Sequence, residues 1–190
     1  MEAGRENAFV DRFLQGRRVR LAPERMVASV DDDGTILMDP LVAKVAMFAE
    51  GRGIGWVRGG VSFIADHEYG HHAMGAPIPE SRLVIEAGET RANVYALAKS
   101  SRPLEDFSSM LALVAAVQYC GAMRQNWIDN HFFELRYGGG RVEDAASRSI
   151  DDTIRHQEAS RYLRQDALDS ARREGLSKFM ELLREVQGGI

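Results

Sequence analysis

The chain has 190 residues, of which 45% are hydrophobic and 27% charged, with a net charge of −4 and a single cysteine, Cys120. This length and composition predict one globular domain, and the mildly acidic balance argues against a primary role in binding nucleic acid or anionic lipid. One cysteine excludes an internal disulfide and a four-cysteine zinc site, so a metal site would have to use carboxylates and the five histidines.

The chain is not expected to cross a membrane. Its longest uninterrupted apolar run, residues 110–117, is well short of the ~20 residues that a helix needs to span a bilayer. The first residues include acidic side chains and lack an apolar stretch, so no secretory signal is expected. Together with the lone thiol, these features favour a cytoplasmic protein.

The first predicted elements are two short strands, residues 27–30 and 35–38. Both are β-prone, and the Asp-rich turn between them ends in Gly34, so we expect them to pair as a hairpin. Asp39 and Pro40 suit the N-cap and first position of a helix, which is predicted for residues 41–50.

Five glycines lie between residues 51 and 60. They do not have the context of a GxGxxG nucleotide-binding loop, because a predicted helix rather than a strand precedes them. We interpret the segment as an irregular loop or edge strand whose glycines allow close approach of the backbone. Gly59 and Gly60 would then lead into the next helix.

After Gly60 the chain is predicted to be mostly helical, with breaks at prolines and glycines. The expected helices are residues 61–74, 85–99, 104–137 with interruptions, 142–175 with a restart near Ser149, and 176–186. In the C-terminal helices, mixed charges with apolar residues at about every fourth position indicate a solvated helix with one buried stripe. A partner-binding or dimerising helix is the alternative for this pattern.

The predicted fold class is therefore α+β, a small β element against a predominantly helical body. We expect a single domain over residues 1–190, with a core at about 27–137 and a helical C-terminal part at 141–187. The oligomeric state is not predicted.

One segment carries a metal-binding pattern, the His-Glu-x-x-His at residues 67–71. On a helix, residues at i and i+4 lie ~40° apart in projection and ~6 Å apart along the axis, so His67 and His71 can share one ion. Glu68 projects about 100° round the helix, where it can reach a water on the metal but is poorly placed to be a ligand. This arrangement favours metal-assisted hydrolysis, with Glu68 as general base and acid.

A catalytic zinc ion needs a third protein ligand and one open position. Glu89 is the preferred third ligand, because Glu89 and Asn93 stand at i and i+4 on a predicted helix. Glu89 can bind the metal while Asn93 orients a ligand imidazole through its remaining ring N–H. Glu86, three residues earlier on nearly the same face, is the alternative ligand.

These motifs resemble the gluzincin branch of the zincin metallopeptidases, whose second motif is Glu-x-x-x-Asp or Asn. His-Glu-Tyr-Gly-His-His at residues 67–72, Tyr95, and residues 36–40 are similar to the bacterial neutral zinc metallopeptidases. Glu-x-x-Ala-Asn at residues 89–93 resembles the ImmA/IrrE family, cytoplasmic zincins linked to cleavage of repressors. The resemblance covers about residues 35–99 and implies a zincin-like fold and a peptide or protein substrate.

The remaining histidines are weaker candidates. His156 resembles a late His and Arg element of the neutral zinc metallopeptidases, although the His-to-Arg spacing is one residue shorter, and it is the candidate for stabilising the oxyanion. A histidine on a helix surface is the alternative interpretation. His72 is expected beside the site or on the surface, His131 in the core with its hydrogen bonds satisfied, and Cys120 as a packed apolar residue.

The sequence thus predicts a zinc-dependent metallohydrolase, and most specifically a metallopeptidase. Two other functions stay open at this point. One is a regulatory or interaction protein that keeps the zinc core and acts through a partner. The other is a non-proteolytic zinc enzyme of small-molecule metabolism, for which a small closed pocket over the metal would be the distinguishing feature.

Overall fold

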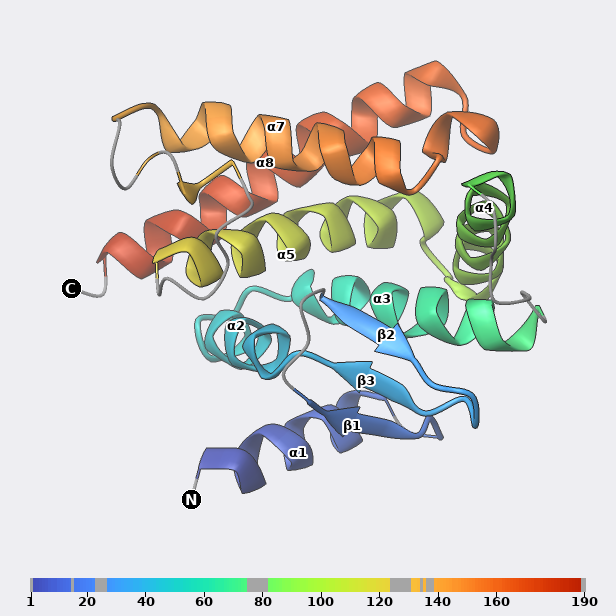
Figure 1. The fold of residues 1–190 in the computed structure, drawn as a ribbon. Coiled ribbons are helices and arrows are strands. Elements are labelled where there is room, and N and C mark those ends of the chain that lie inside the picture. Colours follow the sequence, from blue (N-terminus) through green and yellow to red (C-terminus); the bar gives the residue numbers. More distant parts are fainter. Residues whose placement is uncertain are drawn as a thin grey trace.

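Helices make up most of the computed structural model, which describes residues 2–14, 16–22, 27–74, 82–123, 131–133, 135 and 139–188 (Figure 1). The elements in chain order are α1 (Glu2–Phe13), β1 (Val19–Leu21), β2 (Ala28–Val30), β3 (Ile36–Met38), α2 (Pro40–Gly51), α3 (Val57–Ala73), α4 (Arg82–Lys99), α5 (Pro103–Met123), α7 (Val142–His156), the 3-10 helix η1 (Ala159–Arg161) and α8 (Gln165–Gly188). The predicted class, α+β and mostly helical, is confirmed.

The sheet has three strands in the order β1-β3-β2. β2 and β3 pair antiparallel, so the predicted hairpin is confirmed. Gly34 in its turn has a φ of 79°, a backbone conformation that favours glycine. β1 pairs parallel to β3. Neither β1 nor α1 is predicted from the sequence. β1 has only three residues and, unlike β2 and β3, no hairpin turn marks its pairing.

Helix α2 begins as predicted, with Asp39 Oδ1 accepting a hydrogen bond from the Leu41 N–H at 2.7 Å. The interpretation of residues 51–60 as an irregular loop or strand is wrong from Val57 onward, because α3 begins there. Gly60 lies so close to α5 that an added Cβ would be 2.8 Å from the carbonyl oxygen of Ser109. The glycine therefore serves the packing of two helices.

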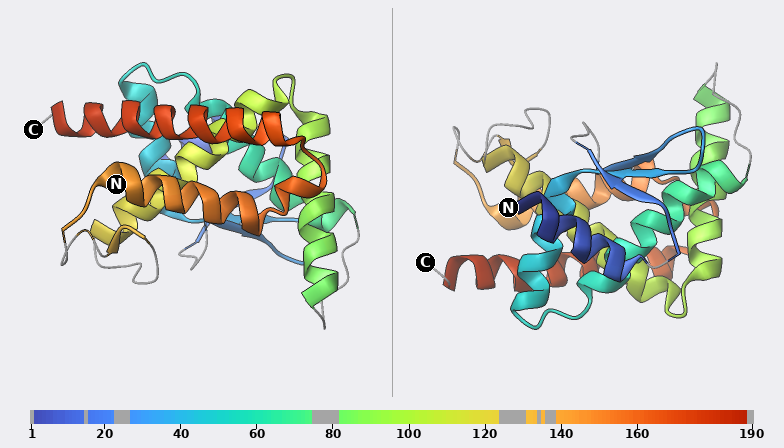
Figure 2. Two further views of the ribbon diagram at one scale, coloured as in Figure 1. Left: turned by 90° about the horizontal axis from the view of Figure 1, so that it is seen from above. Right: turned by 90° about the horizontal axis from the view of Figure 1, so that it is seen from below.

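Helix α5 lies at the centre of the helical body, between α3 on one side and α7 and α8 on the other (Figure 1). Viewed along a perpendicular direction, α7 and α8 run side by side and α4 crosses their ends (Figure 2). By length and composition α5 could cross a membrane, but 78% of its apolar window is buried inside the fold. Its apolar character is thus explained by packing at the centre of the core.

Two predicted boundaries in the C-terminal half are wrong. Helix α7 runs unbroken through Ser149, and α8 runs unbroken through Gly175. The Ser149 hydroxyl is buried and donates a hydrogen bond to Gln118 of α5 at 2.7 Å, and an added Cβ on Gly175 would lie 3.2 Å from Leu111 Cβ. Both small residues permit close packing on α5. The predicted continuation of α5 over residues 124–130 lies outside the described residues.

Gly70 allows α3 and α4 to pack closely. An added Cβ there would lie 2.9 Å from Ala92 Cα and 3.0 Å from the Ala92 carbonyl oxygen. We expect Gly70→Ala to lower the free energy of unfolding by about 1–3 kcal/mol, because overpacking would push the two helices apart. Urea denaturation followed by circular dichroism measures the change.

Gly51→Ala is the matched control for this substitution. Gly51 is also helical, as the last residue of α2, but an added Cβ there meets nothing within 4 Å. We expect this variant to be as stable as the wild type or up to about 1 kcal/mol more stable, because alanine restricts the unfolded chain. Equal unfolding free energies for both variants would contradict the close approach of α3 and α4.

Candidate metal centre

Three side chains from α3 and α4 face one another. His67 and His71 lie one turn apart on α3, and their Nε2 atoms are 3.1 Å apart. Glu89 of α4 places Oε2 3.3 Å from His67 Nε2 and Oε1 3.5 Å from His71 Nε2. The structure thus brings together the three predicted ligands into a group that can hold a metal ion. The side chain of the alternative ligand, Glu86, lies outside the described residues.

The spacing of these atoms suits a single ion. Ligand atoms about 2.0–2.1 Å from a tetrahedral ion lie about 3.3–3.4 Å from one another. The three observed separations, of which each histidine's distance to Glu89 is to a different carboxylate oxygen, run from 3.1 to 3.5 Å. Glu89 Oε2 is also buried without a hydrogen-bond partner among the described residues. A buried carboxylate oxygen in this position is suited to a cation.

Asn93 determines which nitrogen of His67 is free to bind a metal. The Asn93 Nδ2 group donates to two main-chain carbonyls, those of Glu89 at 2.9 Å and Gln157 at 3.1 Å. Asn93 Oδ1 must therefore accept, and it does so from His67 Nδ1 at 3.1 Å. With the proton held on Nδ1, the lone pair of His67 Nε2 points to the centre of the ligand group.

The charges in the ligand group depend on one another. Burial opposes a charge on His67, but the facing carboxylate of Glu89 and the charge of Glu68 outweigh burial and raise the pKa of His67. Burial also opposes a charge on Glu89, but His67 and then His71 outweigh it and lower the pKa of Glu89. The two shifts favour a carboxylate on Glu89 facing positive charge at His67 Nε2, which is the position that a metal cation would take.

Glu68 is close enough to the ligand group to interact with its charges. Burial raises the pKa of Glu68, the charge on His67 opposes the rise, and the charge on Glu89 adds to it. A carboxyl whose pKa is raised towards neutral pH is better suited to exchanging a proton with substrate at that pH. The position and environment of Glu68 thus suit the predicted general base.

The end of α7 and the turn after it complete the surroundings of the ligand group. The Gln157 carbonyl accepts hydrogen bonds from Asn93 Nδ2 and, at 3.0 Å, from the Tyr162 hydroxyl. Glu158 in this turn adopts a left-handed φ of 52°. Burial raises the pKa of Tyr162, and the charge of Glu89 adds to the rise, which places this phenol near the third ligand. Sequence reasoning missed Gln157, because a main-chain carbonyl has no sequence signature.

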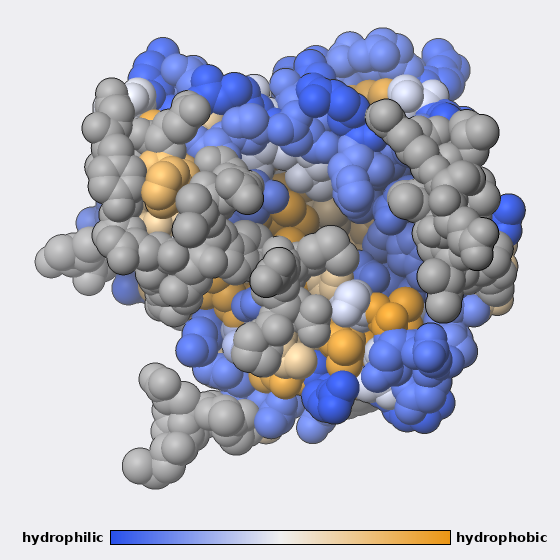
Figure 3. All heavy atoms as spheres, in the orientation of Figure 1, coloured by the Kyte–Doolittle hydropathy of each residue, from blue (hydrophilic) through white to orange (hydrophobic). Residues whose placement is uncertain are grey.

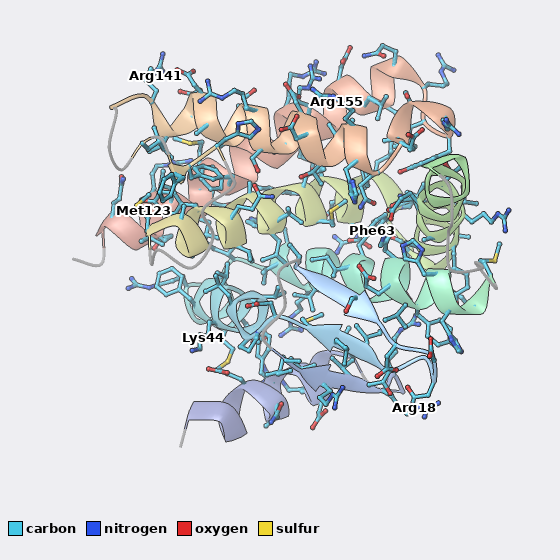
Figure 4. All side chains as sticks on the ribbon, viewed as in Figure 1. Arg18, Lys44, Phe63, Met123, Arg141 and Arg155 are labelled. Atoms are coloured by element: carbon cyan, nitrogen blue, oxygen red, sulfur yellow. The ribbon has the colours of Figure 1, made fainter. Side chains whose placement is uncertain are left out.

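His156 ends α7 and is exposed. A positive charge on His156 would lower the pKa of His71, although burial and the charge of His67 are larger causes of that shift. Its predicted role at the oxyanion stays a prediction. His156 directly follows Arg155, which is labelled in Figure 4.

The other two histidines lie outside the ligand group. His72 is exposed and packs against the turn at Gly34, as expected for a residue beside the site or on the surface. His131 is half-buried rather than in the core. Its Nε2 pairs with the Asp152 carboxylate of α7, so the imidazole has a polar partner, as expected. Cys120 is half-buried and packs against the core.

Comparisons of the chain with protein-family models, with curated proteins and with solved structures found no match. His67, His71 and Glu89 can hold a metal ion, and no relative indicates which one. Function must therefore be inferred from the residues and their geometry.

Removal of the Asn93 amide is expected to weaken metal binding. We expect Asn93→Ala to lower metal affinity about 10–100-fold, because His67 loses the partner that holds its proton on Nδ1. Competition with a chromogenic chelator measures the affinity. Val94→Ala, on the exposed side of the same helix, is the control and should bind metal as the wild type does. Equal affinities for both variants would show that Asn93 does not orient His67.

Proposed function

We propose that this protein is a zinc-dependent metallopeptidase of the zincin type. The observation that carries the proposal is the convergence of His67, His71 and Glu89 around one point, with the proton of His67 held on Nδ1 by Asn93. Two imidazoles and one carboxylate form a ligand set that leaves a fourth position for water or substrate in catalytic zinc sites. The resemblance of the two motifs to gluzincins supports the same conclusion.

Each residue has a distinct role in this proposal. His67, His71 and Glu89 hold the ion, and Asn93 orients His67. When bound, zinc lowers the pKa of a coordinated water to about 7 and polarises a carbonyl group. The Glu68 carboxylate accepts a proton from the attacking water and passes it to the nitrogen of the departing amine.

A peptide is favoured over a small metabolite by the unpaired edge of the sheet. β2 is an edge strand, since the order is β1-β3-β2, and no further strand pairs with it within the described part of the chain. β2 also contacts α3, the helix that carries His67 and His71 (Figure 1). An extended peptide can pair its backbone with such an edge.

The test combines metal analysis with a peptide-library assay. Purified protein is analysed for bound metals by mass spectrometry and incubated with a library of unstructured peptides. We expect about one zinc ion per chain and cleavage that stops on chelation and returns with zinc. Zinc-loaded protein that cleaves no peptide above the level of the chelated sample would overturn the peptidase proposal.

A further inference from the structure

A pocket with a volume of about 370 Å³ is lined by residues that the proposed function does not use. Its walls include the cations Arg17, Arg18 and Lys99 and the rings of Tyr69, His72 and Tyr95. At 100° per residue, Tyr69 stands about 160° round α3 from both His67 and His71. The pocket thus lies on the other side of α3 from the ligand group.

Positive charge exceeds negative charge among the lining residues. Arg17, Arg18 and Lys99 face one carboxylate in the lining, that of Asp33. Arg18 and Asp33 form an exposed ion pair at 3.4 Å, which is weak in water. Arg17 is paired with Asp66 of α3. Arg18 also donates a hydrogen bond to the Asp33 carbonyl oxygen at 3.0 Å. The exposed remainder of the Arg18 guanidinium, and the ammonium of Lys99, which makes no ion pair within the described residues, are available to an anion.

The rings hold the cations in place. The Arg17 guanidinium lies 5.1 Å from the centre of the Tyr69 ring, and Lys99 Nζ lies 5.4 Å from that of Tyr95. The two tyrosine rings are 6.0 Å apart. These contacts hold Arg17 and Lys99 against the tyrosine rings, and the Lys99 ammonium, which is not in an ion pair within the described residues, keeps N–H donors for an anion.

His72 connects α3 to the β2–β3 turn at this pocket. The His72 ring lies 5.8 Å from that of Tyr69 and packs on Gly34, where an added Cβ would be 2.8 Å from His72 Cδ2. The β2–β3 turn and α3 are thereby joined. In Figure 3 the surface over this turn, at the lower right, is hydrophilic, and in Figure 4 Arg18 projects near the same place.

We propose that this pocket binds the oxyanion group, phosphate or carboxylate, of a small molecule. Arginine and lysine together are suited to such groups, because guanidinium and ammonium N–H groups form charge-assisted hydrogen bonds with their oxygens. Its volume falls at the low end of about 300–1,000 Å³ for small-molecule sites. A small molecule therefore fits better than a polymer segment.

The experiment measures anion binding by isothermal titration calorimetry at low salt. The probes are inorganic phosphate, glycerol phosphate and succinate, each titrated into zinc-loaded protein and into the His71→Ala variant. The variant is included because anions can also bind an open metal position. We expect saturable binding of one probe molecule per chain, with the same affinity in both proteins.

Matched substitutions locate the site. We expect Arg18→Gln and Lys99→Gln each to weaken binding about tenfold, because each removes one charge-assisted contact. Lys44→Gln is the control, since Lys44 lies on α2, far from Arg18 (Figure 4). Binding of the phosphates alone, or of succinate alone, would support the proposal and name the ligand class.

Three results would overturn the proposal. One is the absence of saturable binding for all three probes. The second is binding to zinc-loaded protein that disappears in His71→Ala, because the anion would then occupy the metal centre. The third is equal weakening by Lys44→Gln and Lys99→Gln, which would indicate a diffuse charge effect. None of these results bears on whether the protein cleaves peptides.

Discussion

The Glu68→Gln variant is expected to keep its zinc and to lose peptide cleavage by about 100-fold to 10,000-fold, the range that general acid–base catalysis contributes. Glutamine has nearly the shape of glutamate but cannot accept a proton at its side chain at neutral pH. Glu68 is not one of the three residues whose side chains could hold the metal, so all three ligands remain in the variant.

Initial rates on the best library peptide, together with the zinc content of the same sample, check this expectation. Glu143→Gln is the matched control, since Glu143 is a half-exposed carboxylate in the first turn of α7, outside the ligand group. The control should retain full activity and full zinc content. A Glu68→Gln protein that cleaves as fast as the control would remove Glu68 from the mechanism.

The His71→Ala variant should lose both zinc and activity. His71 is one of the three ligands, and its removal leaves one imidazole and one carboxylate, too few to retain the ion through purification. Zinc content should fall from about one ion per chain to near zero. The His71 side chain is 22% exposed, so the helix content of the variant is measured alongside its zinc content.

The next residue provides the control for this loss. His72 shares the helix and the residue type with His71, but its ring faces Gly34 rather than Glu89. His72→Ala should therefore keep its zinc, and circular dichroism should show the same helix content in both variants. Equal zinc content in His71→Ala and wild type would contradict the assignment of His71 as a ligand.

Features formed by neighbours in the chain were predictable. The β2–β3 hairpin depends on a short turn that ends in Gly34, and the start of α2 depends on Asp39 beside Pro40. The positions of His67, Glu68 and His71 relative to one another follow from the geometry of a single helix. In each case the residues that decide the structure are at most a few positions apart.

Small residues misled the prediction because their role depends on distant partners. Gly60, Ser149 and Gly175 look like breaks in a helical pattern, yet each lies within a helix that packs on α5. A pattern of single residues cannot distinguish a glycine that ends a helix from one that lets two helices touch. The parallel pairing of β1 with β3 was not predicted either, because no hairpin turn joins two parallel strands.

The sequence alone determined which residue types could bind a metal and that two of them share a helix face. Whether Glu89 reaches them depends on α4 packing against α3 where Gly70 meets Ala92. The Gln157 carbonyl that orients Asn93 comes from 64 residues further along the chain. Spacing along a helix sets local directions, but contacts between helices depend on packing, and packing exists only once the whole chain has folded.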